Sequence, residues 1–156
     1  MRRLFKHFIL QGQGLRRHTE GGAAVEFAIL GTVLILLVGG IMDFGHAWYI
    51  KQVITNASRE GARYGIAFSV DATAMRIPPC NLSPSIEDYV VNNYISQTSL
   101  ASLNPIVNVT GAGYDTGLKG QPLQVTVSVT KSWFIMGNFI SNLPTNLVAT
   151  TVMLCE

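Results

Sequence analysis

Two acidic residues bracket the most apolar stretch of the chain. Residues 27–42, FAILGTVLILLVGGIM, carry no charge; Glu26 comes directly before them and Asp43 directly after. A carboxylate at membrane depth costs roughly 2.5–3.5 kcal/mol or more, which favours positions at the headgroup boundary or beside a partner. Glu26 therefore either lies at this boundary or pairs with a positive charge. Asp43 either marks the outer boundary or pairs with an Arg or Lys of a neighbouring helix.

The positions of the histidines argue against enzymatic chemistry. The three histidines are His7, His18 and His46, and none comes later in the chain. A Ser-His-Asp or Cys-His arrangement beyond the apolar stretch is therefore nearly excluded. Adjacent helical residues point in different directions, so Glu87 and Asp88 fit helix N-terminal charge better than paired acid–base catalysis. We expect no catalytic residue and no enzyme.

Two cysteines, Cys80 and Cys155, both follow the apolar stretch. An oxidising compartment permits a disulfide between them, and chain-entropy reasoning assigns a loop of this length roughly 4–5 kcal/mol. We expect this disulfide, with two free buried thiols as the alternative. Two cysteines with only His46 nearby do not make a zinc site, and the glycines of residues 111–120 lack the lysine and helix of a phosphate loop. We expect no metal and no cofactor.

The apolar stretch predicts a transmembrane helix. Its residues 27–42 cover about 24 Å as a helix, and an extension to residues 22–48 allows it to cross a hydrocarbon layer of about 30 Å. A buried helix of a soluble protein rarely stays uncharged for so long. A cleaved secretory signal does not fit either, because the apolar run is too long and no small-x-small site closes it.

Charge on the two sides of this helix sets its orientation. The leader, residues 1–21, is basic and contains one acid, Glu20; its cations are Arg2, Arg3, Lys6, Arg16 and Arg17. The positive-inside rule places this leader in the cytoplasm and the chain beyond the helix on the other side of the membrane. Residues 44–156 hold six Lys and Arg and six Asp and Glu. This neutral balance offers no nucleic-acid groove.

Beyond the membrane the helix continues as an amphipathic extension, residues 49–68. Within it Ala57, Gly61 and Gly65 fall four apart and form a small-residue groove. Such a groove lets another backbone approach closely, either from the same domain or from a neighbouring subunit.

Residues 69–156 predict a small α+β domain. A proline-containing connector, residues 69–84, leads to Ser85-Ile-Glu-Asp, a capping box that opens a second helix to about residue 97. Alternating apolar and polar residues predict three strands, at residues 106–110, 123–130 and 148–154. We expect a three-stranded antiparallel sheet packed on both helices, with a long turn between the first two strands. The apolar segment 133–143 fits either a buried or an exposed position.

The sequence GGAAVEF, residues 21–27, resembles the processing site of type IV prepilins. In that family a prepilin peptidase cuts after a glycine, and the fifth mature residue is a glutamate followed by an aromatic residue. A cut between Gly21 and Gly22 makes Glu26 the fifth residue and Phe27 the sixth, whereas a cut after Gly22 makes Glu26 the fourth. The resemblance implies that Glu26 pairs with an N-terminal amine during subunit packing, a contact favourable in low dielectric only when both charges are present.

A second stretch of sequence points to a more specific family. NASREGARYG, residues 56–65, together with AAVEFA, residues 24–29, resembles TadE-like proteins, the pseudopilins of tight-adherence (Flp, type IVc) pilus systems. The resemblance implies a pilin-like fold and a minor pilin held in the bacterial inner membrane before it joins a surface pilus. It also implies three kinds of partner: the prepilin peptidase, other Tad pilins and inner-membrane assembly platform proteins. The alternative is a membrane-anchored periplasmic binding or adhesion module.

Overall fold

The computed structural model describes residues 17–67, 69–73, 75–140, 142–143 and 145–156, with side chains from residue 21 onward. Helix α1 runs from Arg17 to Ile66. The chain divides into two compact units, one ending at Ile41 and the other running from Met42 to Glu156. Helix α1 contributes to both units.

The helix begins earlier than the sequence indicated. Residues 17–21, which the sequence assigned to the leader ahead of the transmembrane helix, are helical. No proline interrupts this stretch, so the helix of the apolar segment continues backwards through it. The first sixteen residues of the predicted leader lie outside the described part of the chain. At its other end α1 stops at Ile66, two residues before the predicted boundary.

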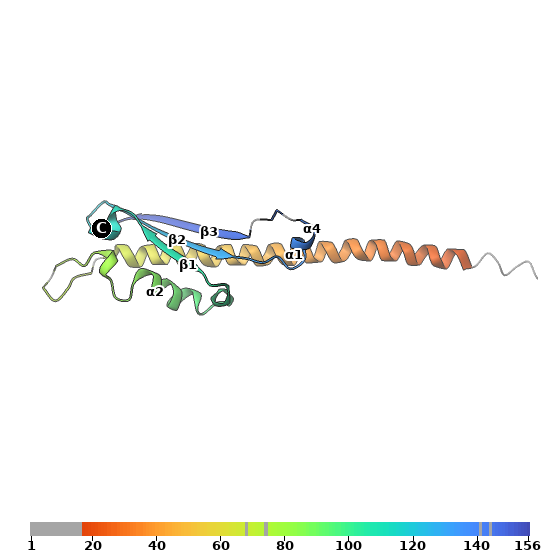
Figure 1. Cartoon of the computed structure of the whole chain (residues 1–156), viewed down its shortest axis with the longest axis horizontal. Helices are drawn as coiled ribbons and strands as arrows, with labels where there is room; N and C mark the ends of the chain where they lie inside the picture. Colours follow the sequence, from red (N-terminus) through yellow and green to blue (C-terminus); the bar gives the residue numbers. More distant parts are fainter. Residues whose placement is uncertain (1–16, 68, 74, 141, 144) are drawn as a thin grey trace, which may run out of the picture. The chain divides into compact units, whose positions relative to one another are not determined.

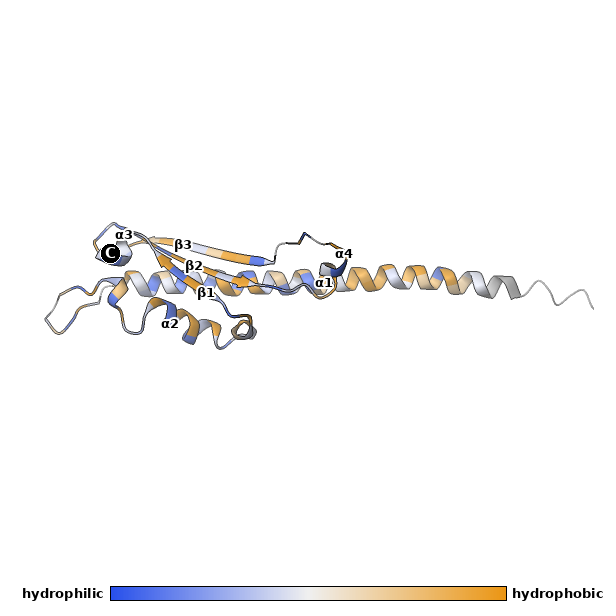
Figure 2. Cartoon of the chain, viewed as in Figure 1, coloured by the Kyte–Doolittle hydropathy of each residue, from blue (hydrophilic) through white to orange (hydrophobic). Residues whose placement is uncertain are grey.

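The first unit is an apolar helix with an exposed surface. From Gly21 to Ile66, α1 is the one helix among the described residues that is long and apolar enough to cross a membrane, and only 6% of its most apolar window is buried. Figure 2 shows the first half of α1 mostly in orange and white, whereas the second half mixes blue and orange. At 1.5 Å per residue, residues 22–42 cover about 32 Å, enough for a bilayer core. A core helix of a soluble protein would be buried instead.

The second unit is built around the amphipathic half of α1. Ile50, Ile54, Ala57 and Ala62 are fully buried on this helix and form a core with α2 and the sheet. In Figure 1 the sheet lies along one side of this half of α1 and α2 along another. Trp48, two residues before Ile50 on α1, is 63% exposed and does not belong to this core.

The sheet is antiparallel with the order β1-β2-β3, as predicted. Its strands are β1, Ile106–Thr110, β2, Pro122–Thr130, and β3, Asn146–Leu154. Each predicted strand is present, and β2 and β3 begin one and two residues early. The inward side chains of β2 are all buried because its period-two pattern places every second residue against α1 and α2. Ser58 of α1 and Thr151 of β3 share a hydrogen bond of 2.8 Å, which ties the helix to the edge strand.

The second helix follows its predicted boundaries in two pieces. Helix α2, Ile86–Val90, continues as a π-helical turn, Val91–Ile95. Ser85 caps it, because its hydroxyl oxygen accepts the backbone N–H of Asp88 at 3.1 Å. The fold is therefore α+β, as the sequence indicated.

Four short helices were not predicted. They are a 3₁₀ turn at Pro79–Asn81, another at Ser99–Leu103, helix α3 at Ala112–Thr116 and helix α4 at Met136–Phe139. Each has five residues or fewer, too short for a helical period to show in the sequence. Helix α3 lies inside the predicted long turn, and α4 lies inside the apolar segment 133–143.

Candidate functional site

The residues of the prepilin-like motif all lie on the exposed surface of α1. Glu26 is exposed and has no ion pair or hydrogen bond through its side chain to any described residue, and the Phe27 side chain is 78% exposed. Gly21 and Gly22 are helical, and a Cβ at either position would meet nothing within 4 Å. None of the side chains that the structure describes therefore covers the motif, which leaves it open to lipid or to another chain.

The small-residue groove is filled within the domain itself. A Cβ at Gly61 would lie 2.5 Å from Cγ2 of Val90, and one at Gly65 would lie 2.4 Å from Cδ2 of Leu123. Ala57 is fully buried. The sequence left open whether the same domain or a neighbouring subunit fills this groove. In the structure, α2 and β2 of the same domain fill it.

The other face of the same stretch is polar and open. It lines a cleft of about 440 Å³ together with side chains from the π-helical turn and β3; the lining residues are Asn56, Arg59, Glu60, Arg63, Tyr94 and Met153. Arg63 and Glu60 form an ion pair of 3.7 Å, as the i,i+3 spacing indicates. The stretch NASREGARYG thus does two things: its small residues pack the core, and its polar residues form a cleft on the surface.

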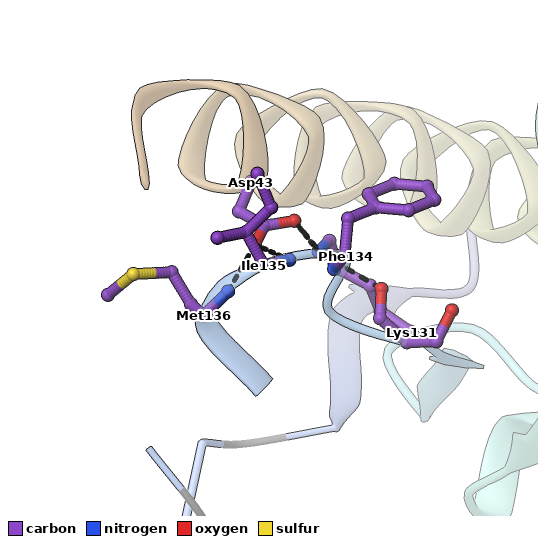
Figure 3. Close-up of polar contacts among 6 residues, drawn as sticks. Asp43, Lys131, Phe134, Ile135 and Met136 are labelled. Carbon is purple, nitrogen blue, oxygen red and sulfur yellow. Dashed lines mark hydrogen bonds and ion pairs between the residues drawn. The ribbon is translucent and has the colours of Figure 1, made fainter. Parts of the chain in front are cut away.

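Asp43 is the most heavily bonded side chain at the start of the second unit. Its Oδ1 accepts the backbone N–H of Phe134 at 2.9 Å, and its Oδ2 accepts those of Ile135 at 2.9 Å and Met136 at 2.8 Å (Figure 3). The side chain is 1% exposed. These three donors belong to the residues that lead into α4, so one carboxylate holds the start of that helix against α1.

Lys131 completes this arrangement from the end of β2. Its Nζ lies 3.8 Å from Oδ1 of Asp43, and its side chain is also 1% exposed. The same Nζ lies 3.8 Å from the centre of the Trp133 ring, within range of a cation–π contact. Burial lowers the pKa of Lys131, and the charge of Asp43 opposes that shift. We call Asp43, Lys131 and the three donating amides the Asp43 clamp.

The clamp was not foreseen from the sequence. We expected Asp43 either at a boundary or paired with a cation of a neighbouring helix, and the cation is instead Lys131, a loop residue of its own domain. One signal was present: Lys131 directly follows the strand pattern and is the only cation between residues 120 and 156. The sequence carries no mark of the backbone amides that provide most of the bonding.

The predicted disulfide between Cys80 and Cys155 is absent, and both thiols are free. Each sulfur contacts a different carbonyl of the short helix α3: that of Cys155 lies 3.7 Å from the Gly113 oxygen, and that of Cys80 lies 3.8 Å from the Asp115 oxygen. Because α3 was not predicted, neither were these separate contacts. No group of three His, Cys, Asp or Glu side chains in the described part of the chain is placed to hold a metal ion.

Comparison with known proteins shows a family similarity over part of the chain. Residues 21–63 match the family model of the TadE-like proteins. The match begins at the glycine pair, includes Glu26 and Asp43, and ends within the stretch that lines the polar cleft. It confirms the resemblance seen in the sequence, and it associates the chain with Tad pilus systems. No curated protein and no solved structure matches the chain.

Proposed function

We propose that this chain, whose residues 21–63 match the TadE-like proteins, is a minor pilin with a structural role in a tight-adherence pilus. Helix α1 is held in the inner membrane with its N-terminus in the cytoplasm and the domain in the periplasm. After processing, the subunit leaves the membrane and packs its helix among those of other Tad pilins. The role is structural rather than catalytic.

One observation carries this proposal: the first half of α1 is apolar and exposed, yet it bears an unpaired carboxylate. Glu26 has no charge partner among the described residues, and the apolar side chains around it, such as Val25 at 60% and Phe27 at 78%, are exposed. A lone charge in an apolar medium is unfavourable, and it becomes favourable when a cation joins it there. A neighbouring subunit's N-terminal amine is a cation of the right kind.

Processing by the prepilin peptidase supplies that amine. A cut between Gly21 and Gly22 releases the basic leader and makes Glu26 the fifth residue. The two glycines lie within α1, where each costs about 1 kcal/mol of helix stability relative to alanine. This cost weakens the helix at the bond that the peptidase must reach.

The polar cleft is the surface that we assign to partner subunits or to the assembly platform. Its lining contains two cations, Arg59 and Arg63, and one acid, Glu60, which pairs with Arg63. The cleft therefore has a net positive charge, which suits an acidic segment of a partner. Four of its lining residues, Asn56, Arg59, Glu60 and Arg63, lie within the segment that matches the TadE-like proteins.

The test is the substitution Glu26→Gln in the natural host, scored by the amount of this protein in purified pili. Glutamine keeps the size of the side chain and removes its charge. We expect normal amounts of the variant in the membrane and its loss from pili. Glu87→Gln is the matched control, because it removes the same charge from α2 in the domain and should leave incorporation unchanged.

Incorporation of the Glu26→Gln protein at the wild-type level would overturn the proposed pairing. Intact pili with lost adhesion would instead favour the alternative, a membrane-anchored periplasmic binding module.

A further inference from the structure

We infer that residues 133–140 form a second, shallow membrane contact, in which the loop and α4 lie in the periplasmic headgroup region of the bilayer. This inference rests on the proposed insertion of α1 and goes beyond it, since it concerns a segment far from α1 in the sequence. The partner is the lipid surface itself.

The composition and exposure of the segment support this role. Its sequence, WFIMGNFI, contains no charged residue. Phe134 is 68% exposed, Phe139 is 67% exposed and Ile140 is 43% exposed. Single exposed apolar residues are ordinary, but three large ones within seven residues form a patch of the kind that marks an interaction site.

The Asp43 clamp holds this patch beside one point along the axis of α1, and we call this position its level. Asp43 directly follows Met42, the last residue of the uncharged run in α1. Covalent continuity therefore places Asp43 where the bilayer core ends, and its three hydrogen bonds hold residues 134–136 at that same level. A segment held there meets the headgroups as soon as α1 spans the membrane.

Aromatic side chains of α1 itself mark the same level. Phe44 and Trp48 are 65% and 63% exposed, with ring centres 6.1 Å apart. The His46 ring lies 5.7 Å from that of Phe134, so α1 and the loop present aromatic groups together. Aromatic residues gather at membrane interfaces because an amphipathic ring suits the headgroup region.

The clamp also reduces the polar cost of placing this loop in lipid. Backbone N–H groups left unpaired in an apolar medium cost several kcal/mol each, and Asp43 accepts all three that lead into α4. The charge of Lys131 is paired with Asp43 and covered by Trp133. An interfacial segment typically sits about 5–10 Å into the boundary of headgroups and acyl chains, a depth that suits a short element such as α4.

The experiment uses the two natural tryptophans, Trp48 and Trp133. The full-length Trp48→Phe variant, in which Trp133 is the sole tryptophan, is reconstituted into phosphatidylcholine–phosphatidylglycerol vesicles and floated on a density gradient. Flotation tests the insertion of α1. Quenching by lipids brominated at different acyl positions then tests the loop. We expect blue-shifted Trp133 emission that is lost most strongly with bromines near the headgroup.

A matched control places a tryptophan elsewhere on the exposed apolar surface. Leu118 is 60% exposed and follows α3. The Leu118→Trp substitution, made in a chain lacking both natural tryptophans, should give emission that is quenched by acrylamide and unaffected by brominated lipid.

Three outcomes would overturn the inference, and they are distinguishable. Protein that floats while Trp133 is quenched only by acrylamide shows an inserted α1 and a loop in water. Protein that floats while Trp133 is shielded from both quenchers shows a contact between proteins. Protein that does not float contradicts the insertion of α1, and both proposals fail together.

Discussion

Removal of the Asp43 carboxylate is the perturbation whose effect follows most directly from the geometry. Asp43→Ala deletes three hydrogen bonds of 2.8–2.9 Å to backbone amides and leaves the ammonium of Lys131 without its acid. Breaking a buried pair by removing one partner typically costs about 3–5 kcal/mol. We expect residues 131–140 to be locally destabilised by at least about 3 kcal/mol.

Hydrogen exchange measured by NMR on the detergent-solubilised protein reports this cost residue by residue. A loss of about 3 kcal/mol corresponds to roughly 100-fold faster exchange, since about 1.4 kcal/mol is a factor of ten. We expect this acceleration at the amides of Phe134, Ile135 and Met136. Asp43→Asn should give a smaller effect, because its single carbonyl oxygen still accepts a hydrogen bond.

Two further variants separate the hydrogen bonds from the charge pair. Lys131→Met should cost less than Asp43→Ala, because the carboxylate keeps its three amide donors. The double variant should cost less than the sum of the two single changes, since neither charge is then left alone. Asp71→Asn is the control: Asp71 also accepts backbone N–H groups, those of Thr73 at 2.8 Å and Met75 at 2.9 Å, but in an exposed part of the chain. Unchanged exchange at the three amides in Asp43→Ala would refute the clamp.

Three other predictions follow from single contacts. Gly61→Ala should lower the free energy of unfolding, measured with urea, by about 1–3 kcal/mol, because the new Cβ would lie 2.5 Å from a valine methyl of α2. Gly45→Ala is the control and should not lower it, because a Cβ at that position would meet nothing within 4 Å. Hydrogen bonds from a threonine hydroxyl and two backbone amides hold the pKa of Asp71 below its usual 3.8. Any stability that this carboxylate contributes is therefore present above pH 3.8 and is lost as the pH falls through the lower pKa of the folded protein. A carboxyl NMR titration with a midpoint at or above 3.8 would contradict this. Native alkylation should label exposed Cys80 well before Cys155, which is 2% exposed, and equal rates would argue against the packing around α3.

The fold was predictable where a repeating pattern ran long enough. Residues 122–130 alternate with period two, and the strand they form begins within one residue of its predicted start. The second helix was identified from Ser85 and Asp88 because a capping box reflects a local hydrogen bond between near neighbours. Local physics of this kind is visible in the sequence.

The Asp43 clamp was not predictable, because its donors are backbone amides about ninety residues away. Every residue type carries such an amide, so no pattern of side chains marks it. The disulfide prediction failed for a related reason, since α3 is too short to show a period and each thiol contacts one of its carbonyls. Long-range contacts between irregular segments depend on the whole fold.

The N-terminal sequence of the protein extracted from the membrane fraction of its natural host shows most directly whether α1 is stored in the membrane and processed at the glycine pair. We expect a detergent-dependent chain that begins at Gly22. An uncut chain recovered in the soluble fraction would contradict both the membrane helix and the assignment to a pilus.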